Sequence, residues 1–179
     1  MKCLLQRTFP VEAAAERAWA ELVAAERWPR WARHLVGVQV TPPGPVGPGS
    51  SATLKLKNRT KARVRVTDFE DGRRFRWEGS FLWLGLGYDH LVTTDDAGGV
   101  SITFTVEGAG VGVDTIGRLF ASMYARTLDR AIPRLQALLR APDRARPQCR
   151  GSAAEASTRL RIYALTSKNA RGSTHTACI

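Results

Sequence analysis

Apolar and polar side chains alternate at a period of two across residues 36–106, and this pattern constrains the fold more than any other feature. In the segment 62–67, for example, Ala, Val and Val alternate with Arg, Arg and Thr. Such alternation is typical of antiparallel strands with one buried face, because successive side chains point to opposite faces. Parallel strands buried on both faces give continuous apolar runs instead. The region therefore predicts a meander of about six antiparallel strands with one apolar face.

Glycine, proline and acidic residues mark the turns of this meander. The segments 42–45, 70–72 and 95–99 carry these residues between alternating runs, and the last is a strong hairpin signal. Gly85 and Gly87 indicate a further turn or bulge. Before the meander, residues 3–9 predict a strand that Pro10 ends.

Apolar residues recur at helical spacing in two other parts of the chain. Residues 15–23 predict a first helix, which Arg27-Trp28-Pro29-Arg30-Trp31 breaks before a shorter helical turn over 32–35. A glycine-rich linker, 108–112, leads to a long helix from the N-cap residue Asp114 to Arg140. Pro133 lies inside this helix, where we expect a bend. The long helix supplies the cover that the apolar sheet face needs.

The composition limits the class of protein. Residues 1–140 predict one domain, and the basic, Ser-, Thr- and Arg-rich segment 141–179 predicts a mostly disordered tail. The three cysteines lack zinc or disulfide spacing, no histidine pair has ligand spacing, and no signal-peptide core or membrane-spanning run is present. We therefore expect a cytoplasmic protein with no metal, no cofactor and no stable membrane insertion, and the sequence leaves its oligomeric state open.

The net charge of +11 raises the question of an acidic partner. Several basic residues share the outward face of neighbouring predicted strands: Lys55, Lys57, Lys61, Arg63, Arg65, Arg74 and Arg76. No aromatic residues interleave with them, so base stacking is not supported and no nucleic acid is expected. A solvated face, with Glu78 nearby, is the interpretation that the pattern favours.

Several short motifs give the chain a family resemblance. They are Phe9-Pro10-Val11, Ala18-Trp19, Trp28-Pro29-Arg30-Trp31, residues 74–79 (RFRWEG) and Tyr88-Asp89-His90, followed by the long final helix. On these residues the chain resembles, over 3–140, the START-like, Bet v 1-like helix-grip superfamily (SRPBCC), in particular its bacterial polyketide cyclase/dehydrase and lipid-transport branch. The resemblance implies an α+β helix-grip fold of β-α-α-β6-α order, in which a curved antiparallel sheet wraps around the long C-terminal helix. It also implies a cavity between the two for lipids, polyketides, steroids or similar molecules.

The aromatic and apolar residues that would face this cavity come from the sheet and the long helix. The predicted ligand-binding residues are Trp77, Phe81, Tyr88, His90, Phe104, Leu119, Phe120 and Met123. The same residues are compatible with a filled core and no cavity, and the resemblance favours the cavity.

His90 and Tyr88 are the candidate catalytic residues, since both occupy the inward face of one strand. His90 suits a hydrogen-bond donor or a general acid/base, although a histidine simply buried in the sheet is the more frequent case. Asp89 points to the opposite face and cannot form a dyad with it. His34 lies near the pocket mouth or serves as a surface or capping residue. Glu107 and Asp114 flank the glycine linker at the expected pocket entrance.

Three functions remain open from the sequence. The leading hypothesis is a binding protein, with little or no catalysis, for a small hydrophobic molecule such as a lipid, a polyketide or a similar aromatic or isoprenoid compound. The alternative is a polyketide cyclase/aromatase-like enzyme that uses the same pocket. The third is an interaction protein that uses the basic sheet face or the tail.

Overall fold

The computed structural model describes residues 1–141, which form a seven-stranded antiparallel sheet, two main helices and two short helical segments. The strands are β1 (Lys2–Val11), β2 (Leu35–Thr41), β3 (Ser51–Leu56), β4 (Lys61–Glu70), β5 (Arg74–Phe81), β6 (Leu84–Thr94) and β7 (Val100–Ala109). The helices are α1 (Ala15–Val23), the 3-10 helix η1 (Ala25–Arg30), the π-helix η2 (Val113–Gly117) and α2 (Arg118–Arg140). Apart from Ala141, the predicted tail 141–179 lies outside the described residues.

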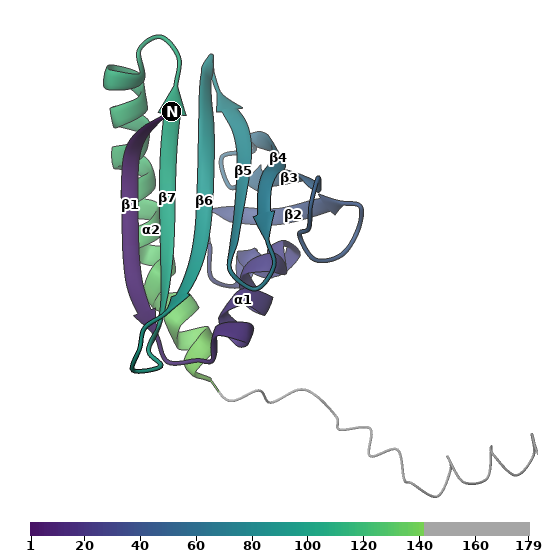
Figure 1. Cartoon of the computed structure of the whole chain (residues 1–179). Coiled ribbons are helices and arrows are strands. Elements are labelled where there is room, and N and C mark those ends of the chain that lie inside the picture. Colours follow the sequence, from purple (N-terminus) through teal and green to yellow (C-terminus); the bar gives the residue numbers. More distant parts are fainter. Residues whose placement is uncertain (142–179) are drawn as a thin grey trace, which may run out of the picture. The chain divides into compact units, whose positions relative to one another are not determined.

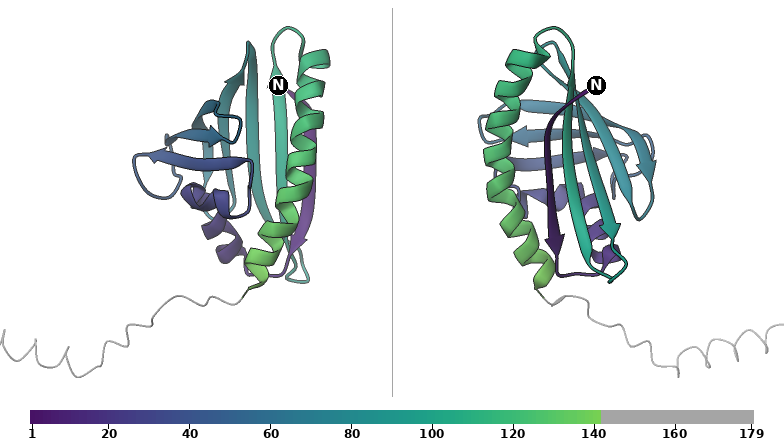
Figure 2. Two further views of the ribbon diagram at one scale, coloured as in Figure 1. Left: turned by 180° about the vertical axis from the view of Figure 1, so that it is seen from behind. Right: turned by 60° about the vertical axis from the view of Figure 1, so that its left-hand side comes forward.

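The sheet order is β1-β7-β6-β5-β4-β3-β2. Strands β2 to β7 are the predicted six-stranded meander, and β1 pairs antiparallel with β7, from Lys2 opposite Gly108 to Val11 opposite Val100. The sheet curves, with α2 along the side of β1 and β7, and with α1 at one end (Figure 1, Figure 2). The expected helix-grip architecture is therefore confirmed.

Sequence predicted most of the strand positions but misplaced two boundaries. β1 continues through Pro10 to Val11, because β1 is an edge strand and an edge strand tolerates proline. Gly85 and Gly87 lie within β6, and the turn before β6 is the two-residue connection Leu82-Trp83, in which Leu82 has φ +56°. The hairpin at 95–99 is confirmed, with Asp95 accepting hydrogen bonds from the backbone N–H groups of residues 97 and 99.

The helical segments differ from expectation at their ends. The short helical turn covers Ala25–Arg30, including Pro29, and does not lie at 32–35. The long helix begins with the π-helical turn η2, in which the Gly117 N–H donates to the Gly112 carbonyl at 3.4 Å. Asp114 therefore lies inside a helical turn and its side chain does not cap the helix; it pairs with Lys2. α2 continues through Pro133, and the bend expected there stays a prediction.

A register shift explains one exposed apolar residue. The alternating pattern that begins at residue 36 predicts Val36 on the same apolar face as Val38 and Val40, but Val36 is exposed, whereas Leu35 is buried. The pairing of β2 with β3 shifts between Leu35 and Gly37, and such a bulge changes the face on which a side chain lies. The remaining inward residues of the sheet pack with α1, η1 and α2 into one core.

Candidate ligand-binding pocket

A cavity of about 560 Å³ lies between the inner sheet face, the segment that contains η1, and α2. Its volume falls within the range of ligand pockets, which is roughly 300–1,000 Å³. Large aromatic side chains contribute much of its wall: Trp28, Trp31, Trp77, Phe81, Tyr88, Phe104, Phe120 and Tyr124. Side chains therefore do not completely fill the space between the sheet and α2. Of the two possibilities that the sequence left open, the structure has the cavity and not the filled core.

Aromatic pairs connect the sheet to the helix beside this cavity. The ring centroid of Phe81 on β5 lies 5.0 Å from that of Phe120 on α2. Tyr88 on β6 lies 5.9 Å from Tyr124, which stacks on Phe120 at 5.8 Å. Rings at these separations attract one another beyond the area that they bury. The pocket wall is therefore held by the same contacts that fasten the helix to the sheet.

The structure brings together seven of the eight side chains predicted to bind ligand. The residues that line the cavity are Trp77, Phe81, Tyr88, His90, Phe104, Phe120 and Met123. Their contact with a ligand stays a prediction.

Leu119 is the exception, since its side chain is 63% exposed and does not line the cavity. The buried side of α2 includes Leu128 and Leu135. Leu119 lies nine residues before Leu128, which at about 100° per residue is half a turn around the helix. The apolar face that the sequence predicted for this helix was therefore too wide at the N-terminal end of α2.

Three aromatic residues in the wall were not among the predicted ligand-binding residues. Trp28 and Trp31 come from the Trp-Pro-Arg-Trp motif, and their rings lie 5.3 Å from Trp77 and 6.3 Å from Phe104 respectively. Tyr124 follows Phe120 by one helical turn on the same face. The sequence did contain a signal for Trp28 and Trp31, because two tryptophans lie close together where the first helix ends.

His90 lies in the pocket wall among aromatic rings. Its ring stacks on Phe75 at 4.6 Å and lies 5.0 Å from Phe104 and 5.4 Å from Trp28. Burial lowers the pKa of His90 to about 4, so the imidazole is neutral at pH 7. Its Nδ1 is buried without a hydrogen-bond partner among the described residues. A neutral imidazole in this position can exchange a hydrogen bond with a bound molecule.

Among residues 1–141, no carboxylate forms a hydrogen bond with Nδ1 of His90. Asp89 lies on the outer face, where it accepts hydrogen bonds from Arg74 Nε at 2.9 and 3.0 Å. Burial raises the pKa of Tyr88 far above its ordinary value, and raises that of Tyr124 to about 12. Both tyrosines are therefore protonated at neutral pH. Within residues 1–141 the wall also includes Lys61 and Asp89, but no histidine–carboxylate dyad forms, because the Asp89 carboxylate pairs with Arg74.

His34 lies in the wall of the cavity and not on the open surface. Its ring meets that of Tyr124 edge-on at 6.1 Å, and burial lowers its pKa to about 4. His34 also lines a second, adjoining cavity of about 320 Å³, whose other lining residues are Arg33, Lys57, Thr127, Arg130, Ala131 and Arg134. Of the two positions that the sequence left open for His34, the structure supports the one at the pocket.

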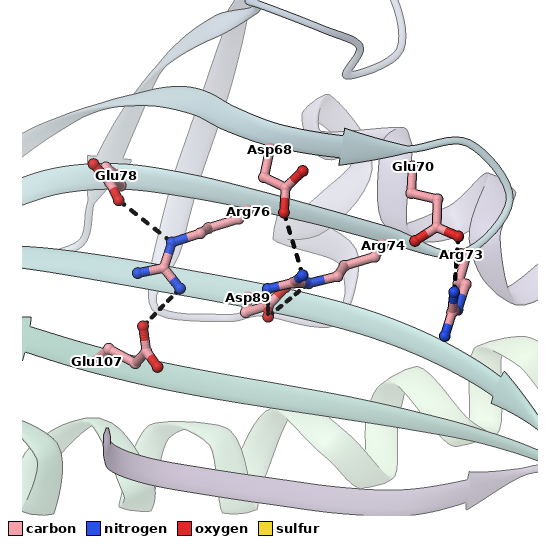
Figure 3. A network of polar contacts seen from close by, with 8 residues as sticks. All are labelled: Asp68, Glu70, Arg73, Arg74, Arg76, Glu78, Asp89 and Glu107. Carbon is pink, nitrogen blue, oxygen red and sulfur yellow. Dashed lines mark hydrogen bonds and ion pairs between the residues drawn. The ribbon is translucent and has the colours of Figure 1, made fainter. Parts of the chain in front are cut away.

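The outer face of the sheet carries a network of ion pairs (Figure 3). Arg74 contacts Asp68 at 3.2 Å and Asp89 at 2.8 Å, and Arg76 contacts Glu107 at 2.6 Å and Glu78 at 3.4 Å. Glu107 therefore does not lie at the pocket entrance, where the sequence placed it. These two arginines of the predicted basic face are neutralised by neighbouring acids, which weakens the hypothesis that the face recruits an acidic partner.

Two features are absent from the described residues. In residues 1–141, no three His, Cys, Asp or Glu side chains are grouped so that they could hold a metal ion. None of the helices in this part of the chain combines the length and apolar character required to cross a bilayer.

Solved structures show the same fold. A hypothetical protein from Helicobacter pylori, jhp0584, superposes with a TM-score of 0.64 at 14% identity, covering 75% of this chain and 86% of its own. The di-domain ARO/CYC StfQ of the steffimycin biosynthetic pathway gives 0.56 at 15% identity, over 77% of this chain and 51% of its own. DynU16, described as a putative protein of the dynemicin biosynthetic locus, gives 0.56 at 17%, over 75% and 46%. At these identities the likeness shows the fold alone.

The curved antiparallel sheet and the long C-terminal helix define a helix-grip protein. Residues 2–140 match the family described as polyketide cyclase / dehydrase and lipid transport, and the chain belongs to that family. No curated protein sequence matches the chain.

Proposed function

We propose that the protein binds a small hydrophobic molecule, such as a lipid, a polyketide or a related aromatic or isoprenoid compound, in the cavity between the sheet and α2. The observation that carries this proposal is the cavity itself, about 560 Å³ in volume and walled by aromatic rings. Burying the apolar surface of a ligand there yields about 25 cal/mol for each Å² removed from water. Family membership is consistent with such a role.

Native mass spectrometry tests the proposal on protein purified from its own host and from a heterologous host. A recurrent bound species supports the proposal and gives the chemical class of the ligand. Titration with the neutral dye Nile red then locates the site. Ala62 lines the cavity, so Ala62→Phe should fill part of it and weaken dye binding by at least tenfold.

A matched substitution provides the control for that titration. Ala97 lies exposed in the turn between β6 and β7, away from the cavity, so Ala97→Phe adds the same side chain and should leave dye affinity unchanged. Equal binding by both variants, together with no co-purified molecule, would contradict the proposal.

A polyketide cyclase/aromatase-like activity is the second candidate. Tyr88, Tyr124 and His34 bring three neutral, proton-carrying groups into one apolar cavity, with neighbouring ring centroids 5.9 and 6.1 Å apart. Loss of a general acid/base typically lowers turnover by about 10²–10⁴-fold. If Tyr88→Phe or His90→Leu lowers turnover of a poly-β-ketone thioester to this extent while binding changes less than tenfold, catalysis is supported. An unchanged rate of cyclisation favours binding alone.

A further inference from the structure

Four of the seven residues that line the second cavity, beside the aromatic one, are positively charged. Its wall contains four cationic side chains: Arg33, Lys57, Arg130 and Arg134. Arg130 and Arg134 lie one turn apart on α2, while Arg33 follows η1 and Lys57 follows β3. The Lys57 N–H donates to the His34 carbonyl at 3.0 Å, which fixes the end of β3 against the segment after η1. Three separate parts of the chain therefore direct cations to one hollow.

None of these four side chains forms an ion pair with an acid in residues 1–141. Elsewhere on the same helix, Arg140 pairs with Glu12 at 2.7 Å and Asp129 pairs with Arg7 at 3.1 Å. Like charges one helical turn apart repel each other. The four residues are exposed, so solvent screens part of this repulsion, and a bound anion would relieve the rest.

The cationic and aromatic cavities adjoin each other, because His34 and Thr127 line both. The His34 Nδ1 is buried and has no hydrogen-bond partner among the described residues. A molecule that extends from one cavity into the other would pass this imidazole. Its apolar part would contact Phe120 and Tyr124, and its polar end would reach the arginines.

We infer that the ligand is an amphiphile whose anionic group, a carboxylate or a phosphate, binds among Arg33, Lys57, Arg130 and Arg134 while its apolar body fills the aromatic cavity. This inference rests on the proposed function and adds the charge of the ligand to it. The guanidinium groups suit such a partner, since their planar array of donors matches two oxygens of a carboxylate or phosphate at once.

Two matched series of compounds test the inference on the full chain, with tryptophan fluorescence as the readout. One series is decanoate, decyl phosphate and 1-decanol, and the other is 2-naphthoate, 2-naphthyl phosphate and 2-naphthol. At pH 7.5 and low salt, we expect at least one anion of a series to bind tenfold or more tightly than its neutral alcohol. High salt should reduce this preference, because screening weakens charge–charge attraction. The tighter of carboxylate and phosphate identifies the headgroup.

A double substitution and a charge-matched control complete the test. Arg130→Gln with Arg134→Gln should lower anion affinity about tenfold and leave the affinity for the alcohol unchanged. Arg63→Gln with Arg65→Gln removes the same charge from the exposed outer side of β4 and should change neither. Equal binding of anion and alcohol by the unaltered protein, or equal losses in both double variants, overturns the inference and leaves the proposed function intact. If no compound of either series binds, the proposed function itself fails.

Discussion

The guanidinium of Arg76 occupies the space that a side chain at Gly87 would fill. A Cβ built on Gly87 would lie 2.8 Å from Cζ of Arg76, closer than such atoms approach in proteins. Arg76 extends from β5 across β6 at this point and reaches Glu107 on β7. The missing side chain at residue 87 thus allows one ion pair to span three strands (Figure 3).

Gly87→Ala should displace Arg76 and break its pair with Glu107. Because this arginine side chain is only 14% exposed, we expect a loss of about 1–2 kcal/mol in the free energy of unfolding, measured by urea titration. In an Arg76→Ala background the same change should be neutral within about 0.5 kcal/mol, since nothing remains to displace.

Gly85→Ala is the matched control on the same strand and face. A Cβ there meets no atom nearer than 3.8 Å, so the variant should keep wild-type stability. If Gly87→Ala and Gly85→Ala behave alike, the Arg76 contact does not explain the glycine.

The buried histidine predicts a decrease of stability on acidification. His90 has a pKa of about 4 in the folded protein against an ordinary value of 6.5. Between these values the unfolded chain binds a proton that the folded chain does not, so stability falls as pH falls. We expect His90 to account for a loss of about 2 kcal/mol between pH 7 and pH 5. His90→Leu should therefore flatten the dependence of unfolding free energy on pH, and parallel curves for variant and wild type would rule out this role.

Two leucines of α2 should respond in opposite ways to truncation. Leu128 is 4% exposed in the core, so Leu128→Ala should cost about 2–5 kcal/mol of stability. Leu119 is mostly exposed, and Leu119→Ala should change stability by less than about 0.5 kcal/mol. Urea unfolding of both variants measures the difference. A large loss for Leu119→Ala would show that this residue packs against the domain after all.

The pocket tyrosines should resist ionisation. Because burial raises the pKa of both Tyr88 and Tyr124, neither contributes to tyrosinate absorbance at 295 nm between pH 9 and pH 10 in the folded protein. Tyr88→Phe and Tyr124→Phe should therefore leave the absorbance rise in this interval unchanged. A smaller rise in either variant would place that hydroxyl in contact with water.

Alternation along the strands was enough to predict the sheet, since one buried face requires it. It could not predict that Gly85 and Gly87 lie inside β6, because glycine between alternating runs usually indicates a turn. The space beside Gly87 is taken by Arg76, a contact that only the tertiary structure reveals. Nor could the alternation predict the position of Val36, which a shift in pairing with β3 determines.

The pocket residues from the sheet were predictable for the same reason as the strands. The exposed position of Leu119 was not predictable, because it depends on which side of α2 packs against the sheet. The helical spacing of apolar residues does not determine how wide that side is. No pattern in the sequence predicted the cationic cavity. Only the tertiary fold brings together Arg33, Lys57 and Arg130. The alternating pattern predicted Lys57 only as an outward residue of a strand.

The pairing of β1 with β7 affects how the chain folds during its synthesis. Lys2 pairs with Gly108, so β1 is synthesised about a hundred residues before the strand that it pairs with. Contacts of such long sequence separation slow folding, because the intervening loop must close first. During translation the apolar side of β1 and the backbone edge of the growing meander are both uncovered, which is the condition under which nascent chains aggregate. The tendency of the nascent chain to aggregate should therefore be greatest before β7 emerges and should fall once α2 can close over the sheet.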